Sequence, residues 1–239
     1  MSADQLLGDA LNDAAELPRV SIVIPAYNEE SVIRQCLIAA IYQSVPAHEI
    51  IVVDNLSTDR TASIVGQMQL EYPETPLLLL TQDLEQGLIP TRNFGLDHAT
   101  GDVLGRIDAD SVLEPDWVEQ VQKAFLDQSV QAATGPVVYY DMPMRRFGLK
   151  ADDKMRQLML KLAKQQYHFL FGSNMALRAS AWETIRAETC RDEKDEMHED
   201  IDLSLHLADH DLRFQYCPQM VSGMSARRLE DSPRDYRYY

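Results

Sequence analysis

The feature that most constrains this chain is an alternation of short apolar runs with helical patterns up to about residue 125. The apolar runs cover residues 20–24, 49–54, 76–81 and 103–107. Continuous runs of this kind are typical of strands buried on both faces of a sheet. Strands that alternate with helices form a mostly parallel sheet. The first half of the chain is therefore predicted to be an α/β domain with a mostly parallel central sheet.

Polar residues follow three of the predicted strands. The junctions are 25–29, 54–59 and 108–110, and in one parallel sheet they gather at the same edge. Asn28 is expected to cap the helix that begins in the first junction. At this edge Tyr27 would lie against a nucleobase, and Asp54 or Asn55 would bond to the edge of the base or to the ribose.

The third junction carries two acids separated by one small residue. In an extended backbone Ala109 points away, so Asp108 and Asp110 are expected to share one side. Two such carboxylates repel unless a positive charge lies between them. Mg²⁺ or Mn²⁺ takes one or two protein carboxylates and completes its shell with water and phosphate oxygens. The pair predicts a metal–diphosphate site, with a solvated acidic turn as the alternative.

Other phosphate and metal motifs are missing. No Gly-x-Gly-x-x-Gly follows the first predicted strand and no P-loop motif occurs, which excludes the usual dinucleotide and P-loop sites. His198–Asp202 lacks the second histidine of a zinc protease. Asp202, His206 and His210 share a helical spacing that we interpret as a surface or core face rather than a metal site.

The second half is less regular. It predicts a strand over 132–140, an amphipathic helix over 150–166, and a glycine-punctuated apolar stretch over 169–178 that leads into a helix near Trp182. A further helix carries Ile201, Leu203, Leu205 and Leu207, and a short strand follows over 212–216.

The net charge and the cysteine content limit the classes of binding partner and the cellular compartment that we expect for this protein. The formal charge of −16 argues against nucleic acid and anionic membranes as partners. Three widely spaced cysteines suit a reducing cytosol. The N-terminus lacks a signal-peptide pattern, and no apolar run approaches about 20 residues, so we expect a soluble, cytoplasmic protein. The Met/Leu face of 150–166 leaves two readings open, which are core packing and peripheral contact with the inner face of the membrane or a lipid-linked acceptor.

Several segments together resemble family 2 glycosyltransferases of the GT-A fold. They are Val-Ser-Ile-Val-Ile-Pro-Ala-Tyr-Asn-Glu-Glu at 20–30, Val-Val-Asp-Asn-Leu-Ser-Thr-Asp-Arg-Thr at 52–61, Gly87 with Thr-Arg-Asn-x-Gly at 91–95, Asp-Ala-Asp at 108–110, Gly-Ser-Asn-Met-Ala-Leu-Arg at 172–178, and Glu-Asp at 199–200. The resemblance implies a single α/β/α sandwich. Its parts would be an extension (1–18), a nucleotide-sugar-binding half (19–128), an acceptor-binding and catalytic half (129–228) and a tail (229–239).

The resemblance also implies roles for individual residues. The nucleotide-sugar would be bound by Pro25, Tyr27, Glu29, Asp54, Asn55, Arg92, Asp108, Ala109 and Arg228. Asp110 and Asp108 would bind Mg²⁺ or Mn²⁺. Asp200, with Glu199 beside it, matches the general base of the inverting members. Arg227 and Arg228 lie where a loop could close over the diphosphate.

Two departures from the family pattern limit what the resemblance implies. Asn55 stands where many members have a second Asp, and because an amide both donates and accepts, the base need not be uracil. The Gln-x-x-Arg-Trp motif of processive polysaccharide synthases is missing, which counts against polymerisation.

The expected activity is inverting, metal-assisted transfer of a sugar from a nucleoside-diphosphate sugar to a hydroxyl group. The acceptor would be a glycan, a lipid-linked molecule or a small molecule. Two alternatives stay open. One is a non-catalytic nucleotide-sugar- or glycan-binding module, and the other is a nucleotidyltransferase that makes sugar nucleotides, although the glycine-rich opening loop of the latter is missing after Ile24.

Overall fold

The computed structural model describes residues 16–140, 169–189 and 199–224. The predicted helix over 150–166, His198, Arg227, Arg228 and the tail over 229–239 lie outside these ranges. Within the described residues, no helix is long and apolar enough to cross a membrane.

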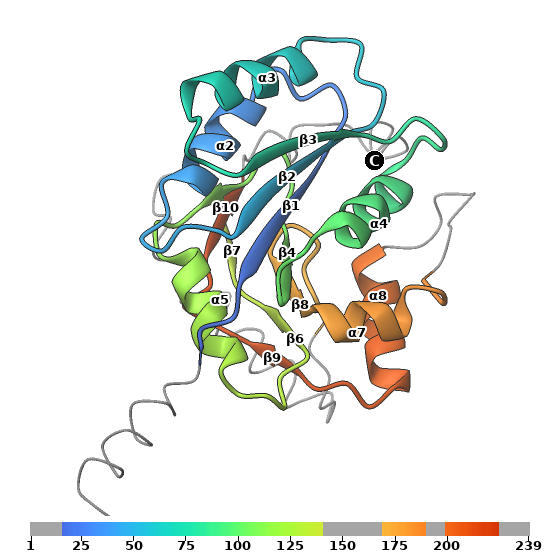
Figure 1. Cartoon of the computed structure of the whole chain (residues 1–239). Coiled ribbons are helices and arrows are strands. Elements are labelled where there is room, and N and C mark those ends of the chain that lie inside the picture. The colour runs from blue at the N-terminus through green and yellow to red at the C-terminus, as the bar shows by residue number, and fades with distance from the viewer. Residues whose placement is uncertain (1–15, 141–168, 190–198, 225–239) are drawn as a thin grey trace, which may run out of the picture.

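A seven-stranded sheet forms the centre of the fold, in the order β3-β2-β1-β4-β8-β6-β9 (Figure 1). The four predicted strands of the first half are present and mutually parallel, as β1 (Val20–Ala26), β2 (Glu49–Asp54), β3 (Leu77–Thr81) and β4 (Val103–Arg106). The helices of this half are α2 (Ile33–Ile41), α3 (Thr61–Glu71), α4 (Leu88–His98) and α5 (Trp117–Phe125). The predicted α/β fold with a mostly parallel sheet is confirmed.

The second half completes the sheet with three short strands, β6 (Ala132–Thr134), β8 (Met175–Arg178) and β9 (Phe214–Tyr216). Strand β8 is antiparallel to both β4 and β6, and β9 is parallel to β6. A second, three-stranded sheet contains β5 (Val112–Leu113), β10 (Ser222–Met224) and β7 (Val137–Tyr139). The sequence did not predict this small sheet.

The single strand predicted over 132–140 was wrong. Gly135 and Pro136 separate β6 from β7, and the two strands belong to different sheets. A side chain at Gly135 would overlap the carbonyl of Met220 and come within 2.9 Å of the Cys217 carbonyl. The chain therefore turns from one sheet to the other where only glycine fits and where proline removes a donor from the ladder.

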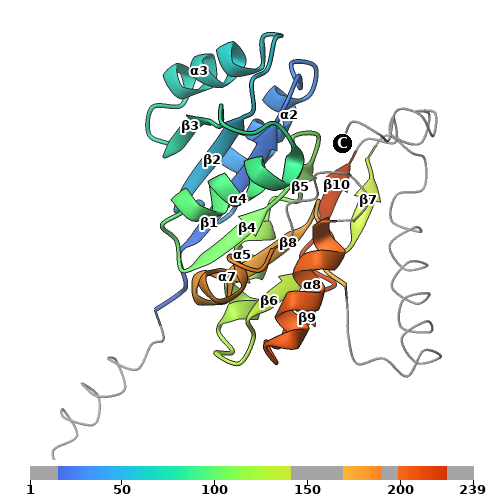
Figure 2. The same cartoon turned by 90° about the vertical axis from the view of Figure 1, so that its right-hand side faces the viewer.

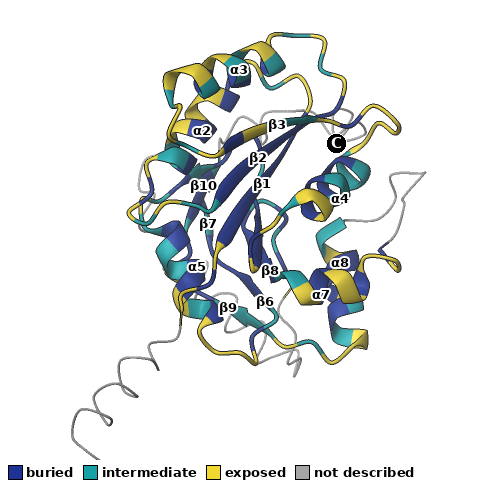
Figure 3. Cartoon of the chain, viewed as in Figure 1, coloured by how far each residue is buried: buried dark blue, intermediate teal, exposed yellow. Residues whose placement is uncertain are grey.

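Helices cover both faces of the central sheet and make it a three-layer sandwich. Side chains of α2, α3 and α5 pack with Ile22 and Ile24 on one face. Helix α4 packs with Val23 on the other, together with α7 (Ala179–Ile185) and α8 (Glu199–Asp209). Figures 1 and 2 show α4, α7 and α8 on the same side. Because alternate residues of β1 enter opposite cores, the strand is buried throughout (Figure 3).

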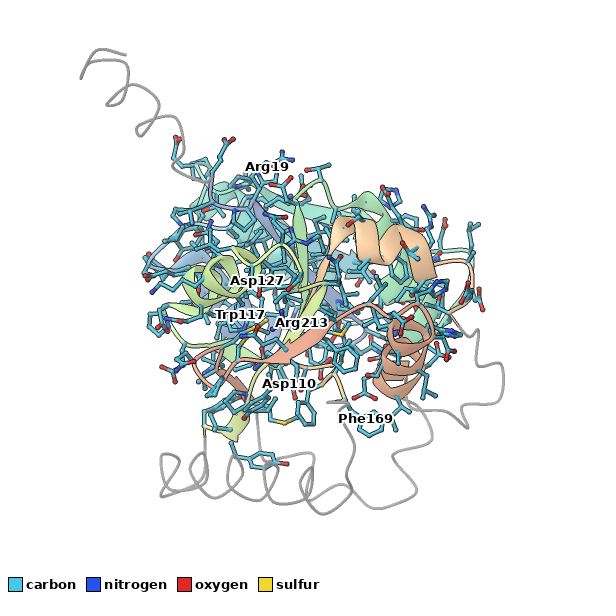
Figure 4. The ribbon with its side chains drawn as sticks, turned by 90° about the horizontal axis from the view of Figure 1, so that it is seen from below. Arg19, Asp110, Trp117, Asp127, Phe169 and Arg213 are labelled. Atoms are coloured by element: carbon cyan, nitrogen blue, oxygen red, sulfur yellow. The ribbon has the colours of Figure 1, made fainter. Side chains whose placement is uncertain are left out.

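Asn174 joins the two sheets. Its side-chain oxygen accepts a hydrogen bond from the indole N–H of Trp117 at 2.8 Å (Trp117 is labelled in Figure 4). Its amide donates to the carbonyls of Pro136 at 3.0 Å and Met220 at 2.7 Å, which precede β7 and β10. A fully buried amide with all of these partners fixes the distance between the sheets.

Candidate functional site

The predicted junctions meet at one edge of the sheet. Strands β1, β2 and β3 end in register, with Ala26 opposite Asp54 and Asp54 opposite Thr81. Strand β4 lies parallel to β1 on its other side, so the acids that follow Arg106 belong to the same edge. Pro25 is the penultimate residue of β1 and is buried beside Val53.

Hydrogen bonds connect the first two junctions. Asn28 has a positive φ of 55°, and its side-chain oxygen accepts a bond from the N–H of Thr58 at 2.8 Å. The N–H of Glu29 donates to Thr61 Oγ1 at 2.8 Å. The predicted helix cap at Asn28 was wrong, because α2 begins only at Ile33 and Asn28 adopts a left-handed conformation that asparagine tolerates. Tyr27 lies in this turn with 39% of its surface exposed.

Asp54 is the last residue of β2, and the two oxygens of its carboxylate have different surroundings. One oxygen, Oδ2, accepts a hydrogen bond from the N–H of Ser57 at 3.3 Å. The other, Oδ1, is buried and has no hydrogen-bond partner within the described ranges. A buried acceptor without a partner is destabilising, so an oxygen of this kind marks a position where a ligand group can donate.

Asn55 is used by the fold itself. Its amide donates to the carbonyls of Gln82 at 2.7 Å and Glu85 at 3.0 Å, and its oxygen accepts from the N–H of Gly87 at 2.8 Å. Gly87 has a φ of 144°, a conformation open to glycine, and α4 starts at the next residue. Asn55 therefore holds the chain that leads into α4 and has no amide hydrogen left for a nucleobase.

The acids after β4 lie in a turn rather than in extended backbone, so that prediction was wrong. Strand β4 ends at Arg106, and the N–H of Ser111 donates to the carbonyl of Asp108 at 3.0 Å. The Ser111 hydroxyl accepts from the N–H of Asp108 at 3.1 Å. The side chain of Ala109 is buried in the core, which leaves only its backbone for a ligand.

The turn gathers negative charge around the buried thiol of Cys36. Burial raises the pKa of this thiol well above its usual range, and the charges of Asp110, Asp108 and Glu29 raise it further. Asp110 is 7% exposed. No group of three or more His, Cys, Asp or Glu side chains suited to a metal occurs among the described residues. Two carboxylates still fit Mg²⁺ or Mn²⁺, because these ions complete their shells with water and phosphate oxygens.

A buried ion-pair network joins this turn to α8. Arg106 Nη2 lies 2.8 Å from Asp108 Oδ1 and 2.9 Å from Glu199 Oε1. Glu199 Oε2 lies 2.8 Å from Nη1 of Arg92, whose side chain is fully buried. Burial lowers the pKa of Arg92, and the charge of Glu199 opposes that effect. We did not predict Arg106 as a site residue, although an arginine in an otherwise apolar strand was the available signal.

Asp200 lies at the start of α8, next to Glu199. Its Oδ2 accepts a hydrogen bond from the N–H of Gly172 at 3.3 Å, and its Oδ1 accepts from the N–H of Ile201 at 2.9 Å. The carboxylate is half-buried. Because Glu199 precedes Asp200 directly, the network brings Asp200 into the same region as the acids of the β4 turn.

The histidines of α8 lie further along the helix, among acids. His206 Nε2 lies 3.2 Å from Asp202 Oδ1, and His210 Nε2 lies 2.9 Å from Glu188 Oε1. Glu188 follows α7, so the contact of His210 joins the end of α7 to the end of α8, whereas the contact of His206 with Asp202 lies within α8.

Comparisons with known proteins identify a family and a fold. The family model of glycosyl transferase family 2 matches residues 21–186. The glycosyltransferase AglE of Haloferax volcanii is 34% identical over 125 residues, which cover 52% of this chain and 40% of the relative. The chain thus spans less than half the length of that relative.

Two solved structures share the fold. A mannosyltransferase from Pyrobaculum calidifontis, solved in complex with GDP-Man and Mn²⁺, has a TM-score of 0.68 at 22% identity, with 93% of this chain and 68% of the other covered. Staphylococcus aureus TarS (residues 1–349), solved in complex with UDP, has a TM-score of 0.60 at 18% identity, with 91% and 62% covered.

Proposed function

The chain belongs to glycosyl transferase family 2 and has the GT-A fold, and from this premise we propose that it transfers a sugar from a nucleoside-diphosphate sugar to a hydroxyl group with inversion. The reaction is a single displacement at the anomeric carbon. The acceptor hydroxyl attacks one face of the sugar, and the nucleoside diphosphate leaves from the other. The acceptor is a glycan, a lipid-linked molecule or a small molecule.

The observation that carries this proposal is the ion-pair chain from Asp108 through Arg106 to Glu199, the neighbour of Asp200. It supports a donor site and a candidate base at one edge of the sheet. Inversion requires the base and the leaving group on opposite sides of the sugar. Acids on two separate elements, the β4 turn and the start of α8, suit that requirement.

The donor half uses the residues at the ends of β1, β2 and β4. The buried Oδ1 of Asp54 accepts a hydrogen bond from the nucleoside, and the exposed ring of Tyr27 lies against the base. Asp110 and Asp108 would hold Mg²⁺ or Mn²⁺, and the bound ion would supply positive charge against the negative charge of the departing diphosphate. The nucleotide-sugar and manganese in the Pyrobaculum neighbour support this assignment.

Asp200 acts on the acceptor. Each carboxylate oxygen accepts one backbone N–H, which orients the group and leaves further lone pairs for the acceptor proton. Removal of that proton as the new bond forms contributes about 10²–10⁴-fold to the rate. Glu199 is occupied by two arginines, so it supports Asp200 rather than transferring the proton itself.

The test is Asp200→Asn, with Asp209→Asn at the exposed end of the same helix as the matched control. We expect Asp200→Asn to lower transfer by about 10²–10⁴-fold and to leave donor binding intact. Donor binding is measured as the rise in melting temperature on adding nucleoside-diphosphate sugars with Mn²⁺, because a ligand of the native state stabilises it. Equal loss of donor affinity in Asp200→Asn would move this residue to the donor site.

A further inference from the structure

We propose that Arg106 is a positioning residue for the transfer reaction, because it ties the acid turn after β4 to the first turn of α8 and so sets the position of Asp200. The inference rests on the proposed function above. It gives a role to a residue that no sequence motif indicated.

The first step of the argument is the way Arg106 is held. Its side chain is 2% exposed, and a single nitrogen lies within 3 Å of carboxylates on two elements, Asp108 in the turn and Glu199 in α8. The charge on this nitrogen attracts both carboxylates, and because a guanidinium is planar, the ammonium of a flexible lysine would hold the two acids in a different arrangement. Movement of either acid is therefore transmitted to the other.

The second step is a direct link from this arginine to Asp200 through Gly172. The N–H of Gly172 donates to Asp200 Oδ2. A Cβ built on the same residue would overlap Arg106 Nη1 and come within 2.9 Å of Glu199 Oε1. Gly172 is thus pressed against the guanidinium while it holds the carboxylate. Arg106 therefore influences the position of Asp200 through two neighbours, Glu199 and Gly172.

The third step is that stability alone does not explain a buried arginine here. Strand β4 is buried at all four positions, and its other residues are Val103, Leu104 and Gly105. Replacing a buried ion pair by apolar side chains of similar volume is often neutral or stabilising. A charge kept at the end of this strand, in contact with acids on both sides of the proposed reaction, fits a role in arranging them.

The experiment is a double-mutant cycle in kcat between Arg106→Lys and Asp200→Asn. Lysine keeps the charge but lacks the planar fork. A misplacement of about 1 Å can reduce a rate by about 10²-fold, so we expect Arg106→Lys to lower kcat by about 10- to 100-fold. In the Asp200→Asn background, where the positioned group is already disabled, the same substitution should lower kcat by less than about threefold.

Controls separate positioning from general damage. The control is Arg178→Lys. Arg178 ends the neighbouring strand β8, at the end opposite to Arg106, and it donates hydrogen bonds to the carbonyls of Val130 and Phe125. This substitution should leave kcat unchanged in both backgrounds. Arg106→Gln keeps a planar polar end group but removes the charge, and it replaces Arg106→Lys in the cycle if that variant does not fold.

Equal losses of kcat in both backgrounds, or an unchanged kcat in Arg106→Lys, would overturn the role of Arg106. Failure of the proposed function gives a different result, since Asp200→Asn alone would then leave transfer unaffected.

Discussion

The buried oxygen of Asp54 gives the sharpest test of the proposed donor site, because one substitution should weaken donor binding without destabilising the free protein. Asp54→Asn preserves the shape of the side chain and can keep the hydrogen bond from the N–H of Ser57. It removes the negative charge and one acceptor from a side chain that is 6% exposed. The unpartnered Oδ1 is thereby replaced by a neutral group.

The magnitude follows from the two states of that oxygen. A hydrogen bond to a charged group contributes about 1.5–3 kcal/mol, so its loss should weaken donor binding by about 10- to 150-fold. In the free protein the same oxygen is a buried acceptor without a partner, which costs about 1–3 kcal/mol. A neutral amide costs less to bury than a charged carboxylate, so the free energy of unfolding should stay constant or rise by about 1 kcal/mol, which raises Tm by about 2–4 °C in a chain of this size.

The assay combines isothermal titration of nucleoside-diphosphate sugars in Mn²⁺ with urea unfolding of the free protein. Asp59→Asn is the control, because this carboxylate is fully used by the fold, with bonds from the N–H groups of Thr61 at 2.8 Å and Glu30 at 3.0 Å. It should lose about 1 kcal/mol of stability. If Asp54→Asn were destabilised like Asp59→Asn and bound donors normally, the assignment of Asp54 would be wrong.

Three further predictions concern packing, pH and metal. A Cβ on Gly95 would overlap Val23 and come within 2.9 Å of Val53 Cγ2. Gly95→Ala should therefore lower the free energy of unfolding by about 1–3 kcal/mol. An unchanged Tm would contradict close packing of α4 on the sheet. Burial raises the pKa of Glu49, but hydrogen bonds from Thr100 and Ser21 outweigh it and lower the pKa overall. The Glu49 carboxylate therefore stabilises the fold above its unfolded pKa of about 4.3, and this stabilisation is lost as the pH falls through the lower folded pKa. The free energy of urea unfolding of Glu49→Gln should depend less on pH below about 4.5 than that of the wild type. The same dependence on pH in both proteins would refute this prediction. Chelation of divalent ions should abolish the rise in Tm caused by donors, and undiminished stabilisation would remove the metal from the site.

Most of the first half of the chain could be predicted from the sequence because its signals are local. The run Val20–Ile24 is apolar at every position but one, which requires burial on both faces, and the structure gives it two cores. Acids at the ends of such strands meet at one edge of a parallel sheet by geometry alone. The expected convergence of Asp54 with the acid turn needed no knowledge of contacts.

The features that were missed depend on contacts between distant segments. The partners of Arg106 include Glu199, which is far away in the sequence. The hydrophobic periodicity of a sequence does not predict an ion pair between such distant residues. The break at Gly135 is set by Met220 and Cys217, which occupy the space a side chain would need. Asn55 matched a family position, yet its hydrogen bonds are determined by the local path of residues 82–87.

The reversed direction of β8 has a consequence for how proteins of this fold diversify. Met175 begins β8 opposite Arg106 at the end of β4, so the loop over 171–174 enters the rim at which four parallel strands finish. Because β1 and β4 lie between β8 and β2, substitutions within that loop leave the strand that carries Asp54 untouched. Under the proposed assignment of Asp54 to the sugar donor and Asp200 to the acceptor, a lineage built on this plan can exchange the molecule it modifies while it retains the activated sugar it consumes.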